Sequence, residues 1–485
     1  MSRYKKYSLG LLCYCLLFQL NSQSIQQAGQ RLIAHPELAS ASIGIDVMDL
    51  ATGESIYAHQ PNRALIPAST QKLITTGVAL KLLGEATHFT TTLAYDGTLD
   101  NGVLTGNLYI VGGGDPCLAS PIMEGAKPGE QLMDEWVSAV QKAGIKRIQG
   151  SIIADDSYFG TAGIAMGWPW ADLGNYYGVG SYGLNWHENF YYLDFIQRPR
   201  EGERPTVHRT RPLIPGLQLW NEVRTGPAGS GDNAYIYGAP FNYQNYLRGT
   251  IPPGSGRFTI KGAIPDPPTF VAQLLTRQLE AVGVSVVLPA SSSRSLQQFY
   301  SGEGQVLHRE DSPSLLAIAE RTNLRSVNMY AESLLRQINK HQGLAVHELS
   351  STASLITYLQ DELGLDTRGV HLEDGSGLAT RNFFPPSFMT AFLRTQAERE
   401  TFLQTIPLAG KTGSMRRRLK GTAAEGRLYA KSGSVNAVRC YAGYAFPQDG
   451  RRLAFSIMVN NYTLSGGDLN RLLLDFMLHL CKSSS

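Results

Sequence analysis

The heptapeptide Pro-Ala-Ser-Thr-Gln-Lys-Leu at residues 67–73 opens an apolar, helix-like segment that ends at Gly84. Residues three apart lie on one face of a helix, so the amine of Lys72 can reach the hydroxyl of Ser69. A serine hydroxyl is a weak nucleophile unless a neighbouring base activates it, which makes Ser69 a candidate nucleophile and Lys72 its base. The pattern Ser-x-x-Lys is weak alone, since Ser2 and Lys5 match it by chance, and a helix N-cap is the plain alternative for Ser69.

A second motif, Ser-Val-Asn at residues 326–328, lies between two helical segments, 313–321 and 329–340. The hydroxyl of Ser326 can relay a proton, and the side-chain amide of Asn328 can hold a substrate backbone. The triplet carries little information until it is combined with other motifs.

A third motif, Lys-[Ser/Thr]-Gly on a strand near the C-terminus, would supply a positive charge and hydroxyls for a substrate carboxylate. Two triplets fit, at residues 411–413 and 431–433. Lys431 ends a strand-like run and a hydrophobic strand-like segment follows soon after, whereas Lys411 leads into a loop. We therefore predict that the site uses Lys431, with Ser432, Gly433 and the following Ser434.

The three motifs occur in the order of the serine acyl-transfer signature. Ser69 and Ser326 are 257 residues apart, and Ser326 and Lys431 are 105 apart. The first separation is much longer than in compact serine β-lactamases, which predicts an insertion between the first two motifs.

The two ends of the chain share a strand-rich character. Strand-like segments at 41–49 and 54–58 match three more at 426–431, 439–446 and 453–460. Helical segments at 26–35 and 469–480 flank them. We expect a sheet made of the first and last strands, flanked by the terminal helices, and an inserted region over 89–288 with short strand-like segments.

Aromatic residues crowd the stretch from Tyr158 to Phe195 within this insertion. We interpret them as the core of the inserted domain in preference to a sugar-stacking surface. The residues concerned include Trp168, Trp170, Tyr176, Tyr177 and Trp186.

Length and composition agree with a multidomain globular protein. A chain of 485 residues needs two or three domains, and 43% hydrophobic with 17% charged residues is ordinary for such proteins. Residues 1–24 are typical of a secretory signal peptide, cleaved near residues 21–23 or retained as an anchor. Without their three basic residues the formal charge falls from +3 to zero, which gives no electrostatic footprint for nucleic acid or anionic membranes.

Cysteine is sparse outside this leader. Cys117, Cys440 and Cys481 are too few for a disulfide framework, although the sequence leaves one bridge open. The chain also lacks the HExxH spacing of zinc peptidases and the G-x-S-x-G of α/β-hydrolases, and no metal or cofactor is predicted.

Over nearly the whole mature length the sequence resembles the low-molecular-mass class C penicillin-binding proteins, the D-Ala-D-Ala carboxypeptidase/endopeptidase family. Five segments carry the resemblance: residues 67–72, 106–116 (GNLYIVGGGDP), 155–157 (DDS), 168–170 (WPW) and 374–378 (DGSGL). It implies an α/β (α+β) fold with a penicillin-recognising, serine transpeptidase-like domain over 25–88 and 289–485, built on an antiparallel sheet flanked by helices. The inserted region over 89–288 would form one or two mostly β subdomains.

The resemblance also implies a function and further site residues. The protein is expected to hydrolyse peptidoglycan peptides ending in D-Ala-D-Ala through an acyl-enzyme, to bind β-lactam antibiotics and to act in the periplasm. Asp155 matches an acidic residue that faces the diamino acid of the stem peptide in relatives, and a turn residue is an equal alternative. Ser376, in the fifth segment, is a further candidate for substrate binding.

The resemblance implies a mechanism as well. Neutral Lys72 would deprotonate Ser69, and nearby Lys431 would help to keep it neutral. Ser326 would protonate the leaving amine, and the amides of Ser69 and Ser434 would bind the oxyanion.

Two other functions remain as alternatives. Glu362-Leu363-Gly364-Leu365-Asp366 faintly resembles the deacylation loop of class A β-lactamases, although Gly364 after an apolar-periodic run is typical of a helix end. A penicillin-sensing or cell-wall-binding protein without turnover is the second alternative, and it predicts acylation without peptide cleavage.

Overall fold

A computed structural model describes residues 25–482, which form two compact units. Unit 1 consists of the chain up to Lys81, Ala319–Ser326, and the chain from Thr352 onward. Unit 2 consists of Leu82–Ile318 and Val327–Ser351. The insertion predicted over 89–288 lies within unit 2, which also takes in residues further along the chain; its exact bounds as a folding domain stay a prediction.

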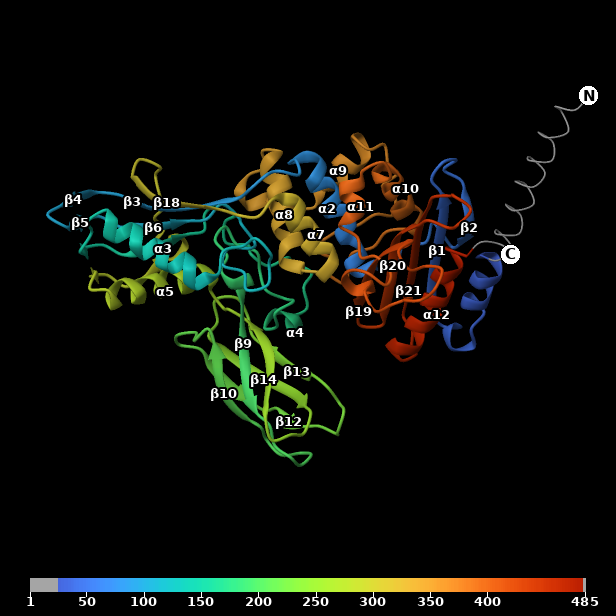
Figure 1. The fold of residues 1–485 in the computed structure, drawn as a ribbon, viewed down its shortest axis with the longest axis horizontal. Helices are drawn as coiled ribbons and strands as arrows, with labels where there is room; N and C mark the ends of the chain where they lie inside the picture. Colours follow the sequence, from blue (N-terminus) through green and yellow to red (C-terminus); the bar gives the residue numbers. More distant parts are fainter. Residues whose placement is uncertain (1–24, 483–485) are drawn as a thin grey trace, which may run out of the picture. The chain divides into compact units, whose positions relative to one another are not determined.

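Unit 1 is built on one five-stranded antiparallel sheet made from both ends of the chain, as predicted (Figure 1). Strand β1 pairs with β21 along its whole length, from Ser42 opposite Asn460 to Asp49 opposite Leu453. In sheet order the strands are β19 (Leu428–Val435), β20 (Val438–Ala445), β21 (Leu453–Asn460), β1 (Ser42–Asp49) and β2 (Ser55–His59).

Helices cover both faces of this sheet. One face packs on helix 25–33 and on α12 (Gly466–His479), and the shared core includes Leu32, Ile457 and Phe476. The other face packs on α10 (Pro386–Gln396). Since burying each large apolar side chain contributes roughly 1.5–3 kcal/mol, this double cover explains why every residue of β21 is buried.

The remaining helices of unit 1 are short, and one of them carries the Ser-x-x-Lys motif. Helix α2 begins at Lys72 and is buried along most of its length, directly after the 3₁₀ turn that contains Ser69. These elements are η1 (Pro36–Leu38), η2 (Ala68–Gln71), α2 (Lys72–Leu82), the larger part of α7 (Leu315–Arg325), α9 (Ala353–Asp361), α11 (Glu400–Gln404) and η5 (Gly413–Met415).

Unit 2 contains a mixed five-stranded sheet and a smaller four-stranded one. Two long helices, α3 (Gly129–Lys142) and α5 (Pro267–Ala281), bury Trp136 and Leu275 in the same core. The first sheet has the order β17 (Ser291–Ser292), β8 (Ile152–Asp155), β6 (Leu108–Val111), β3 (Thr90–Tyr95), β18 (Gln305–Asp311). The second has the order β16 (Ser285–Val286), β7 (Arg147–Ile148), β5 (Val103–Thr105), β4 (Thr98–Asp100).

Two further small sheets in unit 2 share that core through their inner faces, which include Leu193, Ile236 and Leu247. One sheet consists of β10 (Thr206–Arg211), β9 (Phe190–Ile196) and β15 (Arg257–Ala263). The other consists of β11 (Gln218–Asn221), β14 (Gln244–Ile251) and β12 (Arg224–Thr225), with β13 (Asn233–Tyr237) also paired to β14. Unit 2 also contains α8 (Asn328–His341), which is as long as α3, and the short helices α4 (Trp170–Leu173), η3 (His187–Asn189), α6 (Ser293–Leu296) and η4 (Val346–Glu348). Mostly β additions to a helix-flanked sheet are what the sequence predicted.

The aromatic-rich stretch is only partly core. Trp168 and Trp186 are buried, as interpreted from the sequence, but Trp170 and Tyr176 lie at the surface. The hydrophobic periodicity of an irregular loop region does not separate these two classes, because neither a helical nor a strand repeat fixes which side chains point inward.

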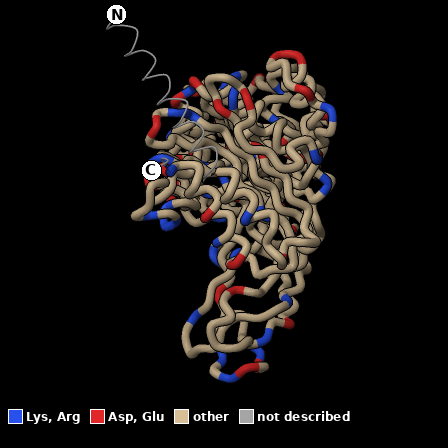
Figure 2. The backbone as a smooth tube through the Cα atoms, turned by 90° about the vertical axis from the view of Figure 1, so that its right-hand side faces the viewer, with Lys and Arg blue, Asp and Glu red and all other residues tan. Residues whose placement is uncertain are grey.

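Charged residues and free cysteines are the remaining surface and core features of the described residues. Figure 2 shows basic and acidic residues of both signs scattered over the described chain. No helix within residues 25–482 is both long and apolar enough to cross a membrane. Cys117, Cys440 and Cys481 are buried free thiols, and burial raises the pKa of Cys440 and of Cys481 to about 12. The predicted signal peptide lies outside the described residues.

Candidate active site

Ser69 and Lys72 form a hydrogen-bonded pair at the start of α2. Lys72 Nζ lies 2.9 Å from Ser69 Oγ, and the lysine side chain is fully buried. The N-cap of this 3₁₀ turn is Pro67, and no side-chain capping bond is made there, so Ser69 does not act as a cap. Ala68, directly before the serine, has a left-handed φ of 47°, a strained conformation of the kind found at functional sites.

Ser326 and Lys431 form a second pair of the same kind. Lys431 Nζ donates to Ser326 Oγ at 2.9 Å and to the main-chain oxygen of Ser432 at 2.8 Å. Lys431 is also fully buried, on strand β19. Burial first, and then the charge of Lys72, holds the pKa of Lys431 well below its usual value. The two pairs therefore interact electrostatically within unit 1.

The alternative triplet is placed differently. Lys411 is exposed and its Nζ forms an ion pair with Glu425 at 3.0 Å. An exposed ion pair of this sort contributes little to stability, because solvent screens it. The structure thus brings Lys431, and not Lys411, to Ser326.

Strand β19 lies very close to the nucleophile because of a glycine. A Cβ on Gly433 would lie 2.6 Å from the main-chain oxygen of Pro67 and 3.0 Å from the amide nitrogen of Ser69, which any other residue would be forced to avoid. β19 is also the edge strand of its sheet, so an extended peptide can add beside it. Ser432 is half-buried and Ser434 exposed at this edge.

Ser414 is a hydroxyl that sequence reasoning missed. Its Oγ lies 3.3 Å from Ser432 Oγ, although the loop that carries it was set aside with Lys411. No sequence signal marks it, since the contact joins a loop to a strand.

Ser376 contacts Lys72 through its main chain. Its main-chain oxygen accepts a hydrogen bond from Lys72 Nζ at 2.7 Å, while its fully buried hydroxyl donates to Asp374. This geometry supports a role in positioning Lys72, and the substrate-binding role expected of Ser376 stays a prediction.

Asp374 organises the loop that presents this carbonyl. Its carboxylate accepts bonds from the amides of Gly377, Leu378 and Ala379 at 2.8–3.0 Å and from the side chain of Asn382 at 2.8 Å. The segment was recognised in the sequence as a family-like motif, but no role for Asp374 could be inferred from it.

The loop is also fixed against the nucleophile segment. Thr75 Oγ1 donates to the main-chain oxygen of Gly375 at 2.6 Å, and the Gln71 side chain donates to the main-chain oxygen of Asp374. Gly377, with a φ of 78°, contacts the main chain of Ala68 so closely that a Cβ would lie 2.0 Å from its oxygen. The loop and η2 therefore form one rigid support for Lys72.

Asn328 begins α8 in unit 2. Its side-chain amide donates to the main-chain oxygen of Tyr177 at 2.7 Å, and little of the residue is exposed. This bond holds the orientation of the side chain at the N-terminus of the helix.

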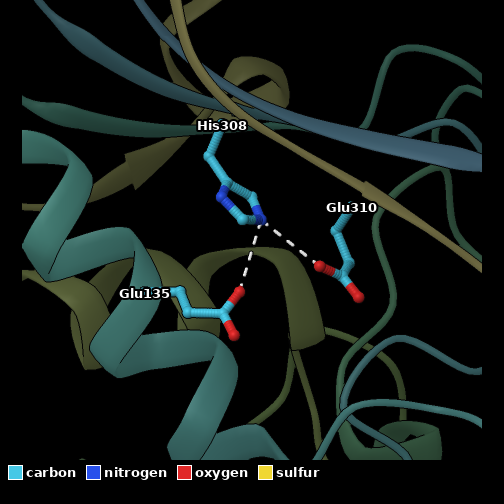
Figure 3. Close-up of side chains that lie close together, drawn as sticks. All are labelled: Glu135, His308 and Glu310. Atoms are coloured by element: carbon cyan, nitrogen blue, oxygen red, sulfur yellow. Dashed lines mark hydrogen bonds and ion pairs between the residues drawn. The ribbon is translucent and has the colours of Figure 1, made fainter.

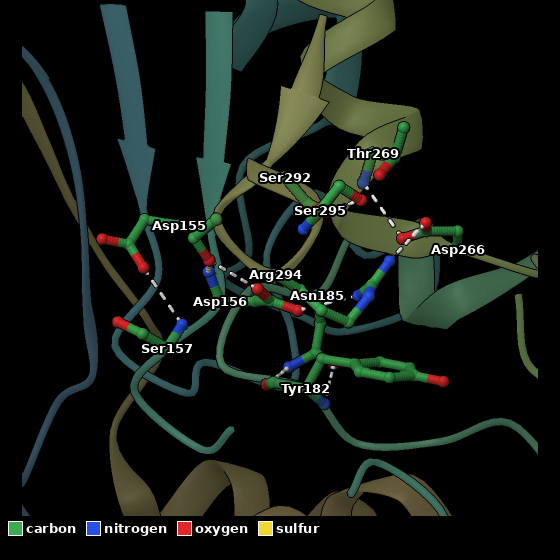
Figure 4. A network of polar contacts seen from close by, with 11 residues as sticks. Asp155, Asp156, Ser157, Tyr182, Asn185, Asp266, Thr269, Ser292, Arg294 and Ser295 are labelled. Atoms are coloured by element: carbon green, nitrogen blue, oxygen red, sulfur yellow. Dashed lines mark hydrogen bonds and ion pairs between the residues drawn. The ribbon is translucent and has the colours of Figure 1, made fainter. Parts of the chain in front are cut away.

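Asp155 ends β8 in unit 2, and both of its oxygens accept from backbone amides. The amide of Ser157 donates at 3.0 Å (Figure 4), and the amide of Tyr300 donates at 2.8 Å. The carboxylate is buried, so the geometry matches the turn-residue alternative. Beside it, Arg294 pairs with Asp156 at 3.3 Å and Asp266 at 2.6 Å.

One group of three metal-type ligands exists among the described residues, in unit 2. His308 Nε2 lies 3.8 Å from Glu135 and 3.2 Å from Glu310 (Figure 3). Lys127 Nζ already contacts these two carboxylates at 2.5 and 2.7 Å. The ammonium group occupies the place of a cation, so the residues form an ion-pair network, and we assign no metal to it.

A family profile and two curated relatives all point to D-Ala-D-Ala carboxypeptidases. The profile of the D-Ala-D-Ala carboxypeptidase 3 (S13) family matches residues 25–472. A D-alanyl-D-alanine carboxypeptidase from Actinomadura sp. (strain R39) is 27% identical over 462 residues, which cover 89% of this chain and 80% of that protein. The D-alanyl-D-alanine carboxypeptidase DacB from Haemophilus influenzae is 25% identical and covers 88% and 87%.

A solved structure has the same fold. The crystal structure of penicillin binding protein 4 (dacB) from Haemophilus influenzae superposes with a TM-score of 0.77 at 24% identity, covering 94% of this chain and 98% of that one. The same protein in complex with a β-lactam gives a TM-score of 0.73 at 23% identity. Because the family profile spans the described chain almost from end to end, this protein belongs to the D-Ala-D-Ala carboxypeptidase 3 (S13) family of serine peptidases.

Proposed function

We propose that the protein hydrolyses the bond between the two D-alanines of peptidoglycan stem peptides, as a carboxypeptidase or on crosslinks as an endopeptidase, with Ser69 as the nucleophile. The observation that carries this proposal is the 2.9 Å hydrogen bond from the buried Lys72 to Ser69, beside a second buried Ser–Lys pair.

In the acylation step Lys72 removes the proton of the Ser69 hydroxyl as its oxygen attacks the substrate carbonyl carbon. Two buried ammonium groups repel each other, so the pair Lys72 and Lys431 holds one proton more readily than two. The carbonyl of Ser376 keeps Lys72 Nζ in reach of the hydroxyl. Proton transfer by a positioned group of this kind contributes about 10²-fold to 10⁴-fold to the rate.

In the second half of acylation the C–N bond breaks and the departing D-alanine amine needs a proton. Ser326 Oγ donates it and is resupplied by Lys431 Nζ, its hydrogen-bond partner at 2.9 Å. Water then attacks the acyl carbonyl carbon and gives a proton to Lys431 through Ser326. The bond from that carbon to Ser69 Oγ breaks, and Lys72 returns its proton to Ser69.

Substrate binding uses the β19 edge. The amides of Ser69 and Ser434 form the oxyanion hole, a type of interaction whose loss typically costs about 10²-fold to 10³-fold in rate. The hydroxyls of Ser432 and Ser434 with Lys431 hold the terminal carboxylate. Asn328 orients the peptide backbone.

β-lactams mimic the scissile peptide and acylate Ser69 in the same way. The β-lactamase alternative gains no support, since α9 ends at Asp361 and Glu362 is an exposed C-cap followed by Gly364 in a left-handed conformation. We further propose that residues 1–24 direct the chain across the inner membrane, so that the enzyme acts in the periplasm.

Two measurements on one preparation test the function. Mass spectrometry after penicillin labelling should locate one adduct, on Ser69, and a peptide ending in D-Ala-D-Ala should release D-alanine. The Ser69→Ala variant should lose both. Rapid turnover of penicillin would favour the β-lactamase, acylation without D-alanine release would favour the sensor, and an adduct elsewhere would remove Ser69 from its role.

A further inference from the structure

A row of four aromatic side chains crosses the surface of the sheet formed by β11, β14 and β13. The strand register sets Trp220 beside Tyr246, and Tyr246 beside Tyr237. Trp170, at the start of α4, extends the row, with its ring centroid 5.1 Å from that of Tyr237. We call these four residues the aromatic row.

The aromatic row lies on the solvent side of the sheet. Trp170, Trp220 and Tyr246 are 57%, 56% and 39% exposed. Successive strand residues point to opposite faces, and the neighbours Ile236 and Leu247 are buried on the inner face. The rings therefore add little to the core, and an exposed cluster of large aromatic side chains is typical of a binding surface.

Polar side chains border the rings on both sides. On one side Arg248 places its guanidinium carbon 5.3 Å from the centroids of both Tyr237 and Tyr246, and its Nε donates to Glu222 at 2.9 Å. On the other side Gln218 and Gln244 stand opposite each other in the β11–β14 register, and both are exposed. The surface is thus a strip of rings between two lines of hydrogen-bonding groups.

This combination fits a saccharide. A pyranose ring offers a flat face of C–H groups that packs on an aromatic ring, while its hydroxyl and amide groups project from the edge and need polar partners. A lipid would require aliphatic side chains for its acyl chains or a cluster of basic side chains for an anionic headgroup. The residues named for this strip include neither. Trp220 and Tyr237 are two strand spacings apart, roughly 10 Å, so the row extends further than one sugar ring.

We propose that the aromatic row binds the glycan strand of peptidoglycan, independently of the peptide site. The inference rests on the proposed function, because the stem peptides of that substrate are covalently attached to a polysaccharide of N-acetylated sugars. Binding at the row would keep the enzyme on the polymer that carries its peptides.

The test uses glycan strands from which an amidase has removed the peptides, with the full-length mature protein first acylated at Ser69 by penicillin. Wild-type protein should bind these strands in an affinity sedimentation assay. The double variant W220A/Y246A should bind at least roughly tenfold more weakly. Phe299→Ala, which removes an aromatic side chain of similar exposure (55%) outside the sheet, should bind as the wild type does.

Two controls keep the outcome interpretable. Both variants should retain the wild-type melting temperature and the wild-type kcat/KM on a small soluble D-Ala-D-Ala peptide. If the double variant does not fold, Trp220→Ala alone takes its place, since more than half of that side chain is already in solvent. If the wild-type protein binds the glycan but does not hydrolyse the peptide, the proposed function is wrong and this inference is not affected.

Several results would overturn the inference itself. These are failure of the wild type to bind peptide-free glycan, equal binding by W220A/Y246A, row-dependent binding to phospholipid vesicles in place of glycan, and a row-dependent dimer in sedimentation equilibrium without glycan binding.

Discussion

The main-chain oxygen of Ser376 lies 2.7 Å from Lys72 Nζ, although 304 positions separate the two residues in the chain. A carbonyl cannot be changed by substitution, so its position has to be tested through the group that holds its loop. That group is the carboxylate of Asp374, which accepts three backbone amides and the Asn382 side chain.

Replacing Asp374 with asparagine should slow the acylation of Ser69 by a fluorescent penicillin by roughly 10²-fold, the effect expected of a displacement of about 1 Å at a reacting group. One acceptor oxygen becomes an N–H donor that faces other donors, and a buried unpaired group of this sort costs about 1–3 kcal/mol. The rate constant at saturating penicillin should fall more than the apparent affinity changes.

Ser376→Ala is the matched control for this experiment. It removes the hydroxyl bonded to Asp374 and keeps the main-chain oxygen on Lys72, so acylation should stay within about threefold of wild type, in line with the loss of one hydrogen bond. A loss as large as that of Asp374→Asn would show that the Ser376 hydroxyl itself takes part in the reaction or in substrate binding.

Lys431→Met should reduce D-alanine release by at least about 10²-fold, since it removes the partner of Ser326 and the charge proposed for the substrate carboxylate. Lys411→Met is the control from the other triplet, and its exposed pair with Glu425 predicts near-wild-type activity. If Lys411→Met lost more D-alanine release than Lys431→Met in a steady-state assay, the third motif would be residues 411–413 and not 431–433.

Lys431 should also give a pH-dependent stability. Its folded-state pKa is lowered by burial and by the charge of Lys72, so at pH values below that pKa the folded protein must bury an ammonium group. This destabilising contribution is fully present at low pH and fades as the pH rises toward 10.5, where the unfolded chain also loses its proton.

The melting temperature of Lys431→Met minus that of wild type should therefore decrease as the pH is raised from neutral into the alkaline range. The same difference for Lys411→Met should stay flat. A difference for Lys431→Met that is constant or grows with pH would contradict the lowered pKa.

Gly433→Ala should slow the acylation of Ser69 strongly while the protein still folds. The new Cβ would meet the main chain of Pro67 at 2.6 Å and the Ser69 amide at 3.0 Å, so β19 has to move away from the nucleophile. We expect a destabilisation of about 1–3 kcal/mol with a larger relative loss in penicillin acylation rate. Gly256→Ala, whose Cβ meets only Gln197 at 3.7 Å, serves as the neutral comparison in both assays.

The sequence was sufficient to predict the Ser69–Lys72 pair because one helical turn links the two residues. The strands at both ends were also predictable, since their hydrophobic runs are long and bounded by turns. The choice of Lys431 over Lys411 followed from its strand context.

Contacts between main-chain groups far apart in the chain could not be predicted. The approach of the Ser376 carbonyl to Lys72 depends on how a loop folds around Asp374, and no side-chain pattern encodes it. Asp155 shows the same limit, because a carboxylate that binds a ligand and one that caps two backbone amides look alike in a sequence. Trp168 and Trp170 are two positions apart and have opposite burial. No helical or strand repeat in this loop region shows which of the two side chains points inward.

The pairing of β1 with β21 has a consequence for how the enzyme is made. During synthesis, strand β1 leaves the ribosome shortly before its neighbour β2 but long before its other neighbour β21, because Ser42 pairs with Asn460 and Asp49 with Leu453. Long-range pairing of this kind forms late and slowly in folding. We therefore expect the sheet beside the nucleophile to be completed only after β21 has been synthesised, so that the chain gains activity only once its C-terminal strands are present.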